Sequence, residues 1–251
     1  MPLRASDIPA FYRDAYAPSA DAARYGRWRA LSAIAKADHI VRLAAAIGMS
    51  SPGGVADIGC GDGGVLSELG RRGFGVRRVG FEIAAAAVGM AAGRSEIDEA
   101  AVFDGEHVPA ADGAYDLAYA SHVLEHVPSP GPLLREMMRV ASAVVIEVPL
   151  ERNLSARRPA ARAVSEAAGH IQRFDRAAVR ELIADAGWHV RGEILDPLGL
   201  AVHLFDCSSL GSRAKGTGKW AVRRAAAAVP PLGTRILTLH YAVIATQAPG
   251  D

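Results

Sequence analysis

The chain has 251 residues and a formal net charge of +1 at pH 7, and half of its residues are hydrophobic. This is the composition of a globular protein with room for one large core, and it gives no general reason to expect nucleic acid or a membrane as partner. Its two cysteines, Cys60 and Cys207, form no C-x-x-C motif, which argues against a disulfide framework or a cysteine zinc site and favours a reducing cytoplasm.

Residues 1–50 are expected to form a lid and a helix. Residues 25–48 carry apolar side chains at helical spacing, and Gly48 is a suitable helix end. The segment before them, with Tyr12 and Tyr16 among prolines, is either a lid or a disordered tail. The chain has no apolar signal segment and no hydrophobic run that could span a bilayer, so we expect a cytoplasmic protein.

From residue 55 onward, predicted strands and helices alternate. Strands are expected at 55–58, 78–83, 100–105, 115–121, 143–150, 188–195 and 237–247. Helices are expected at 65–73, 84–95, 132–141 and 175–187, the last with Asp175 as N-cap and Gly187 as its end. This pattern predicts a doubly wound, Rossmann-like α/β sheet of seven strands, with the last strand antiparallel.

The domain plan places an α/β core at 51–198, a cap insertion at 199–235, and the last strand and tail at 236–251. The insertion is expected to hold a glycine-rich loop, GSRAKGTGK, followed by a short alanine-rich helix that ends at Pro230-Pro231. No acidic residue occurs between Cys207 and Gly250. These cations are either a solvated surface or a cap that attracts an anionic substrate.

The stretch VADIGCGDGG, residues 55–64, fits two cofactors. Its glycines match G-x-G-x-x-G, which binds dinucleotides, and also D-x-G-x-G-x-G, which begins at Asp57. A carboxylate at Asp57 would repel a pyrophosphate but could accept from an ammonium group. Glu82 and Asp104 end the next two strands, where they could bind a ribose and an adenine amine. The ligand that fits these three acids has an amino-acid end, a ribose and an adenine, but no phosphate.

These motifs resemble the class I S-adenosylmethionine-dependent methyltransferases, especially the small-molecule group with a VLEH-like motif. The resemblance rests on DIGCGDG, Glu82, FDGEHVP and YDLAYASHVLEHVPSPGPLLREMMRV. It covers residues 55–150 well and 170–190 loosely. It implies S-adenosylmethionine as cofactor, with these binding residues: Asp57, Gly59, Cys60, Gly61, Glu82, Ile83, Asp104, Gly105, Glu106 and Ser121.

Several of these residues also have an ordinary structural explanation. Glu82 could favour a helix N-terminus, Asp104 could be a turn residue, and Cys60 could simply be a small residue in the turn. Glu125 is expected to pair locally and His122 to support its loop.

His126 and His170 are the candidates for a general base in methyl transfer, because family members often place their acceptor near these segments. Tyr16, His170 and Arg173 are the candidate substrate residues. The arginines at 157, 158 and 162 are expected on a solvated helix face. The sequence shows no metal-ligand motif, so no metal is expected.

The sequence therefore predicts an enzyme that transfers a methyl group to an oxygen, nitrogen or carbon atom of a small molecule. Two alternatives remain open: an NAD(P)-dependent oxidoreductase, and a protein that binds S-adenosylmethionine without catalysis. The expected partner is a small-molecule substrate, which could be anionic. Nucleic acid is not expected, because the chain has no basic stripe with interleaved aromatic residues.

Overall fold

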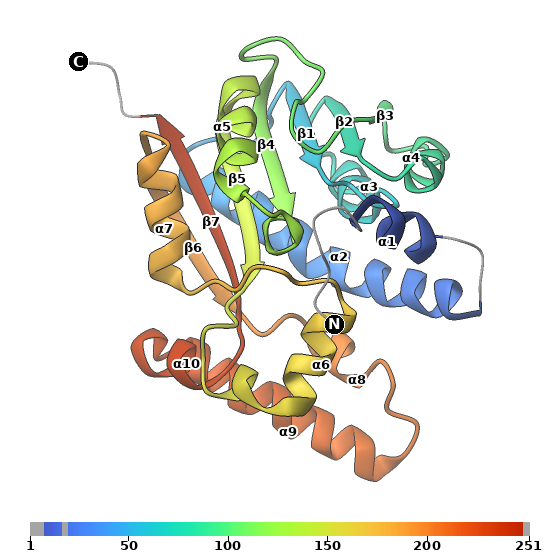
Figure 1. Cartoon of the computed structure of the whole chain (residues 1–251), viewed down its shortest axis with the longest axis vertical. Coiled ribbons are helices and arrows are strands. Elements are labelled where there is room, and N and C mark those ends of the chain that lie inside the picture. Colours follow the sequence, from blue (N-terminus) through green and yellow to red (C-terminus); the bar gives the residue numbers. More distant parts are fainter. Residues whose placement is uncertain (1–7, 17–19, 248–251) are drawn as a thin grey trace.

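A computed structural model describes residues 8–16 and 20–247, and the remaining parts of the predicted lid and tail lie outside these ranges. One mixed sheet forms the centre of the molecule (Figure 1). Its strands are β1 (Gly54–Ile58), β2 (Arg77–Glu82), β3 (Glu99–Val102), β4 (Tyr115–Ser121), β5 (Ala141–Pro149), β6 (Trp188–Asp196) and β7 (His240–Gln247). Their order is β3-β2-β1-β4-β5-β7-β6, and only the pairs that involve β7 are antiparallel. The predicted fold class is confirmed.

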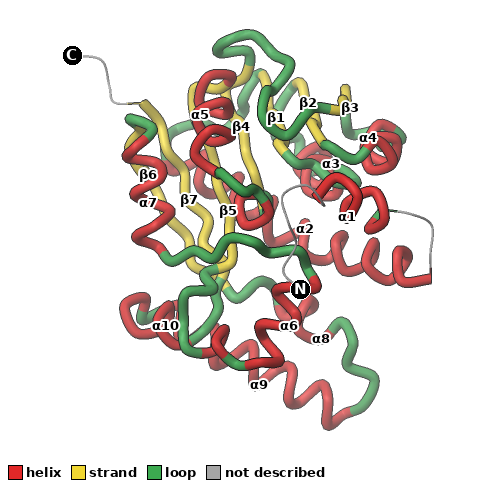
Figure 2. Tube along the Cα trace, viewed as in Figure 1, coloured by secondary structure: helices red, strands yellow, loops and turns green. Residues whose placement is uncertain are grey.

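Helices cover both faces of this sheet, which Figure 2 shows as one layer of strands. The helices α2 (Ala20–Ala46), α3 (Gly64–Arg71) and α4 (Ala85–Ala92) contribute to one core, and α5 (Pro130–Val140) and α7 (Arg176–Asp185) to the other. Side chains of β4 alternate between the two cores, with Leu117 and Tyr119 in one and Ala118 and Ala120 in the other. Burial on both faces explains why the strands lack polar alternation.

Three helix ends confirm their predicted signals. The Asp175 carboxylate accepts a hydrogen bond from the backbone N–H of Ala178 at 2.9 Å, which caps α7. Gly187 follows that helix with φ +79°, and Gly48 follows α2 with φ +80°. Both glycines adopt the left-handed conformation that commonly ends a helix.

Short helices connect the core elements. They are α1 (Ile8–Ala15), the 3-10 turns η2 (Leu124–His126) and η3 (Ser155–Arg157), and α6 (Pro159–Ala167). Among the described residues, no helix is both long and apolar enough to cross a bilayer.

The cap differs from its prediction. It consists of α8 (Leu200–Leu204), α9 (Leu210–Ala227) and α10 (Pro230–Ile236), so the segment expected as a glycine-rich loop is helical. Ser209 starts α9 with a capping box that includes Ser212. A Cβ on Gly216 would lie 2.9 Å from the carbonyl oxygen of His203. This glycine is therefore a packing position where α9 crosses α8, a role that its local sequence does not reveal.

Two glycines of α9 provide a matched test of this correction. Gly218 has open space where a Cβ would be placed, so Gly218→Ala should stabilise the helix by about 0.5–1 kcal/mol. Gly216→Ala should destabilise the protein, because its Cβ meets the backbone of α8. Thermal and denaturant unfolding of both variants measures the difference. If Gly218→Ala lowers stability, the segment is not helical in solution.

Candidate active site

The glycine turn after β1 brings the backbone close to neighbouring side chains. Gly59, Gly61 and Gly63 all have positive φ angles. A Cβ on Gly59 would lie 2.5 Å from a methyl group of Val123, and one on Gly61 would lie 2.5 Å from the hydroxyl of Tyr16. Both positions therefore favour glycine for conformation, and Gly59 also favours it for space.

Asp57 is the buried acid at the end of β1, with 3% of its surface exposed. The hydroxyl of Tyr119 donates to its Oδ2 at 2.7 Å. Burial raises the pKa of Asp57 to about 7, although this hydrogen bond and the charge of Lys36 act in the opposite direction. A cation beside Asp57 would favour its ionised form.

Glu82 joins the end of β2 to the glycine turn. Its carboxylate accepts hydrogen bonds from three backbone N–H groups, those of Gly61 at 2.9 Å, Ile83 at 2.7 Å and Ala84 at 3.0 Å. Burial raises its pKa, and the three N–H groups oppose that shift. A carboxylate has about four lone-pair positions, so Glu82 can accept about one further hydroxyl proton.

Asp104 lies in an exposed turn after β3. Its Oδ1 accepts from the backbone N–H groups of Glu106 and His107 at 2.7 and 2.6 Å, and its Oδ2 lies 3.1 Å from Nδ1 of His107. These backbone bonds, with His107, hold the pKa of Asp104 at about 2. Gly105 follows with φ +88°. Asp104 thus orders the turn and remains ionised near neutral pH.

A polar stripe on α2 faces the buried side of the helix, and the sequence analysis did not identify it. Arg29 donates to Asp62 at 2.8 Å, and Ser32, Lys36 and His39 are buried on the same face. Their spacing of three, four and three residues is helical and is the signal that could have found them. Lys36 is 9% exposed, and the described residues give its ammonium group no hydrogen bond or ion pair. Burial lowers its pKa, and Glu147 is the largest opposing charge.

Glu147, near the end of β5, is a second unpredicted member of the site. His39 lies 3.3 Å from its Oε1, and the hydroxyl of Ser121 donates to its Oε2 at 3.3 Å. Although burial raises the pKa of Glu147, His39 holds it at about 2. Hydrogen bonds to Asp196 and Glu147 in turn raise the pKa of His39 to about 9, against the effect of burial. Ser121 thus lies beside a buried ion pair.

His122 occupies the left-handed conformation, with φ +60°, which is uncommon for residues other than glycine. Its Nδ1 lies 3.0 Å from the Glu125 carboxylate, and its Nε2 lies 2.8 Å from Nδ1 of His240 on β7. Burial lowers the pKa of both histidines well below the usual value. Glu125 is 1% exposed, and neither of its carboxylate oxygens has a partner with hydrogen-bond geometry.

His126 and His170 lie in different segments of the chain, and the tertiary structure brings their rings together. Their ring centroids are 4.9 Å apart. Nδ1 of His126 donates to the carbonyl of Gly169 at 3.1 Å, and Nδ1 of His170 lies 3.0 Å from Glu151. Burial lowers the pKa of His126, whereas Glu151 raises that of His170 against the effect of burial. Glu151 was not identified from the sequence.

The helix α1 and the residue after it contact each part of this site. A Cβ on Gly169 would lie 2.9 Å from the ring of Phe11, and the ring of Tyr12 packs edge-on against His126 at 5.7 Å. Tyr16 lies over Gly61, with the guanidinium of Arg29 5.0 Å from its ring centroid. The structure therefore places Tyr16 at the glycine turn and not beside His170 or Arg173.

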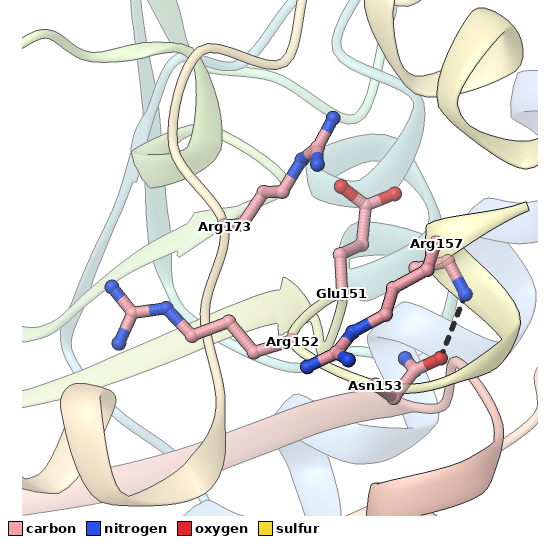
Figure 3. Close-up of a pocket in the computed structure, with 6 residues that line it drawn as sticks. Glu151, Arg152, Asn153, Arg157 and Arg173 are labelled. Carbon is pink, nitrogen blue, oxygen red and sulfur yellow. Dashed lines mark hydrogen bonds between the residues drawn. The ribbon is translucent and has the colours of Figure 1, made fainter. Parts of the chain in front are cut away.

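A cavity of about 300 Å³ opens next to Glu151. Its lining includes Glu151, Arg152, Asn153, Ala156, Arg157 and Arg173 (Figure 3). Arg152 pairs loosely with Asp175 at 3.8 Å, but within the described ranges Arg157 and Arg173 have no ion-pair partner. Arg157 was expected on a solvated helix face, but it lines this cavity.

Two groups of three side chains could each offer ligand atoms to a metal ion, although sequence spacing did not reveal either group. They are His122, Glu147 and His240, and Glu125, His126 and His170, with the atoms of each group within 4.8 Å of one another. The 2.8 Å separation of His122 and His240 is a hydrogen-bond distance. Tertiary contacts alone assemble both groups.

Comparison with known proteins identifies the family. Norajmaline N-methyltransferase and ajmaline N-methyltransferase of Rauvolfia serpentina are 32% and 30% identical to this chain over 113 residues. Each match covers 41% of this chain and 38% of the relative, so it spans well under half of either protein.

Solved structures share the fold. Geranyl diphosphate C-methyltransferase from Streptomyces coelicolor A3(2) superposes with a TM-score of 0.62 at 18% identity, covering 85% of this chain and 78% of that one. The [4+2]-cyclase SpnF gives 0.59 at 15% identity, with 86% and 81% covered.

A family model described as a methyltransferase domain matches residues 25–193, more than half of the chain. This match includes the glycine turn, Asp57, Glu82, and both His126 and His170. The chain belongs to the methyltransferase domain family.

Proposed function

We propose that this protein transfers a methyl group from S-adenosylmethionine to an oxygen, nitrogen or carbon atom of a small molecule. The observation that carries the proposal is the meeting of Asp57, Glu82 and the glycine turn at the carboxyl ends of β1 and β2. Ligands of doubly wound sheets bind at this edge. Family membership supports this cofactor over a dinucleotide, and the buried Asp57 carboxylate would repel a pyrophosphate.

The cofactor's ribose would bind at Glu82, which has a lone pair left for a hydroxyl group. Its adenine would lie between Ile83 and the turn of Asp104, Gly105 and Glu106, where the ionised Asp104 can accept from an exocyclic amine. Gly59, Cys60 and Gly61 would pass beneath the cofactor, and Ser121 would lie near its methionine end.

The amino-acid end of the cofactor has two charges, and this site offers a complement to each. Asp57 would accept from the ammonium group. Lys36 is a buried cation without a partner among the described residues, and its charge is close enough to lower the pKa of Asp57. We therefore assign the cofactor carboxylate to Lys36, because an unpaired buried ammonium group is costly.

S-adenosylmethionine supplies a methyl group bonded to a sulfonium, which is a good leaving group. The protein has then mainly to align the acceptor and exclude water. Helix α1 would act as the lid, since Phe11, Tyr12 and Tyr16 cover the three parts of the site. Where the acceptor must lose a proton, His126 or the His170–Glu151 pair would take it, and Glu151 would act as a positioning residue.

The acceptor would be anionic. Two arginines without ion-pair partners line the cavity beside Glu151, and this glutamate contacts the candidate base His170. Arg173 was predicted from the sequence as a substrate residue, and we add Arg157 as a second candidate. One structural relative is named for an anionic acceptor, geranyl diphosphate.

Both cysteines are free, which supports a reducing cytoplasm as the place of action.

The charge of Asp57 predicts that the affinity for S-adenosylhomocysteine depends on pH. Because only the ionised carboxylate attracts an ammonium group and its pKa is about 7, the affinity for S-adenosylhomocysteine should rise about tenfold between pH 6 and pH 8. Calorimetric titration at both pH values measures this. Asp57→Asn should bind weakly and lose the rise. Asp104→Asn is the control that keeps it, since Asp104 is ionised throughout this range.

The assignment of Lys36 predicts a selective loss. Lys36→Met keeps the buried stem but removes the charge, so it should bind S-adenosylhomocysteine about tenfold or more weakly. It should bind 5′-methylthioadenosine, which lacks the amino-acid end, as well as the wild type does. Equal losses for both ligands would mean that Lys36 acts only on folding. If the wild type binds neither, the cofactor proposal itself fails.

The arginine cavity predicts an anion site. The protein loaded with S-adenosylhomocysteine should bind inorganic pyrophosphate, and Arg157→Ala or Arg173→Ala should weaken that binding about tenfold, the value of a charge-assisted hydrogen bond. Arg162→Ala is the control, because Arg162 is exposed and does not line the cavity. Calorimetry gives the affinities. An equal effect of all three substitutions would contradict a defined site.

A further inference from the structure

Helix α9 has an exposed apolar stripe. Leu210 is 88% exposed and Val222 is 61% exposed. The stripe consists of Leu210, Ala214, Gly218, Ala221, Val222 and Ala225, all exposed and all at helical spacing. A helix that faces water normally carries charged or polar side chains at these positions, so the stripe needs an explanation.

The opposite face of α9 is fixed against the protein. Gly216 and Ala227 are buried, and the indole N–H of Trp220 donates to the carbonyl of Leu198 at 3.2 Å. The apolar stripe therefore faces away from the molecule. In Figure 1, α9 lies at the outer edge, with α10 packed beside it.

Cations border the stripe on both sides. At 3.6 residues per turn, Arg213 and Arg224 lie along one edge and Lys215 and Lys219 along the other. All four are exposed, and none forms an ion pair with a described residue. Because no acidic residue occurs from Cys207 to Gly250, the surface has one sign of charge. Such a pattern is typical of helices that lie in the interface of an anionic bilayer.

We infer that α9 docks in the plane of an anionic lipid surface, with its apolar stripe toward the acyl chains and its flanking cations at the head groups. The adjoining α10 adds the exposed Leu232 and Ile236, at 58% and 39%, and the exposed Arg235. Attachment is peripheral, because no described helix could span a bilayer. The inference stands apart from the proposed methyl transfer.

Charge and chemistry favour lipid over other occupants. A second copy of this chain would bring the same cations face to face, which costs energy. Single-stranded nucleic acid would use exposed aromatic side chains for stacking, but the only aromatic residue on α9, Trp220, is turned inward. An apolar stripe between two rows of cations matches a surface with acyl chains beneath anionic head groups.

The inner face of α9, opposite the apolar stripe, approaches the segment next to the arginine cavity. Arg223, on the inner side of α9, has a pKa lowered by burial and by the charge of Arg158. Arg158 directly follows η3, whose Arg157 lines the cavity. This segment therefore lies behind α9, on the side away from the apolar stripe.

Vesicle co-sedimentation of the full chain tests the inference. The protein should bind vesicles of phosphatidylcholine mixed with phosphatidylglycerol. Its affinity for vesicles of phosphatidylcholine alone should be about tenfold lower. Raising the salt concentration should weaken binding, because salt screens exposed charges. The double variants Leu210→Gln with Val222→Gln, and Lys215→Glu with Lys219→Glu, should each lose most of the binding.

The matched control is Val76→Gln with Val164→Gln, which removes two apolar side chains that are 72% and 71% exposed elsewhere. This control should bind vesicles like the wild type. All variants should retain the wild-type affinity for S-adenosylhomocysteine, which shows that they fold. This second readout separates a failure of lipid docking from a failure of the cofactor proposal.

Three results would overturn the inference. The first is a wild type that does not sediment with anionic vesicles. The second is a dimer in light scattering that the Leu210 and Val222 substitutions dissociate, which would make the face an interface between copies. The third is binding to an acidic polyglutamate peptide without binding to vesicles, which would indicate an acidic protein partner.

Discussion

Four of the buried carboxylates at one edge of the sheet impose the constraint on which the rest of this structure depends. They belong to Asp57, Glu82, Glu125 and Glu147, each with no more than 6% of its surface exposed. They meet because β1, β2, β4 and β5 run parallel, so that their carboxyl ends and the loops that follow lie at the same edge. Removing a carboxylate from water is costly unless it is paired or hydrogen-bonded.

The structure meets this cost differently for each acid. Backbone N–H groups surround Glu82, which fixes the glycine turn, and His39 from α2 pairs with Glu147. Asp57 has one hydroxyl donor, and Glu125 has no well-directed donor. Asp57 and Glu125 therefore receive the least compensation from the protein itself, and Glu82 keeps about one lone-pair position for a further donor.

The same edge explains the position of the cap. β6 runs parallel to β5 and ends at this edge, and the antiparallel β7 begins there. Any insertion between these two strands must therefore emerge beside the site. Helices α8 to α10 occupy that connection and leave β7 hydrogen-bonded to both neighbours. The cap thus lies beside the candidate site without interrupting the sheet.

The sequence by itself determined the α/β class, the strand that carries the glycine turn, and Asp57 and Glu82 as its acids. These features depend on local patterns: strand-length apolar runs, glycines at a strand end, and acids at the next strand ends. Only the tertiary structure decided that the charge of Lys36 acts on Asp57, that His39 pairs with Glu147, that Glu151 supports His170, and that the glycines of α9 belong to a helix. Each of these outcomes depends on a contact between separate elements, such as α2 with β5 or α9 with α8, and a local pattern does not contain such contacts.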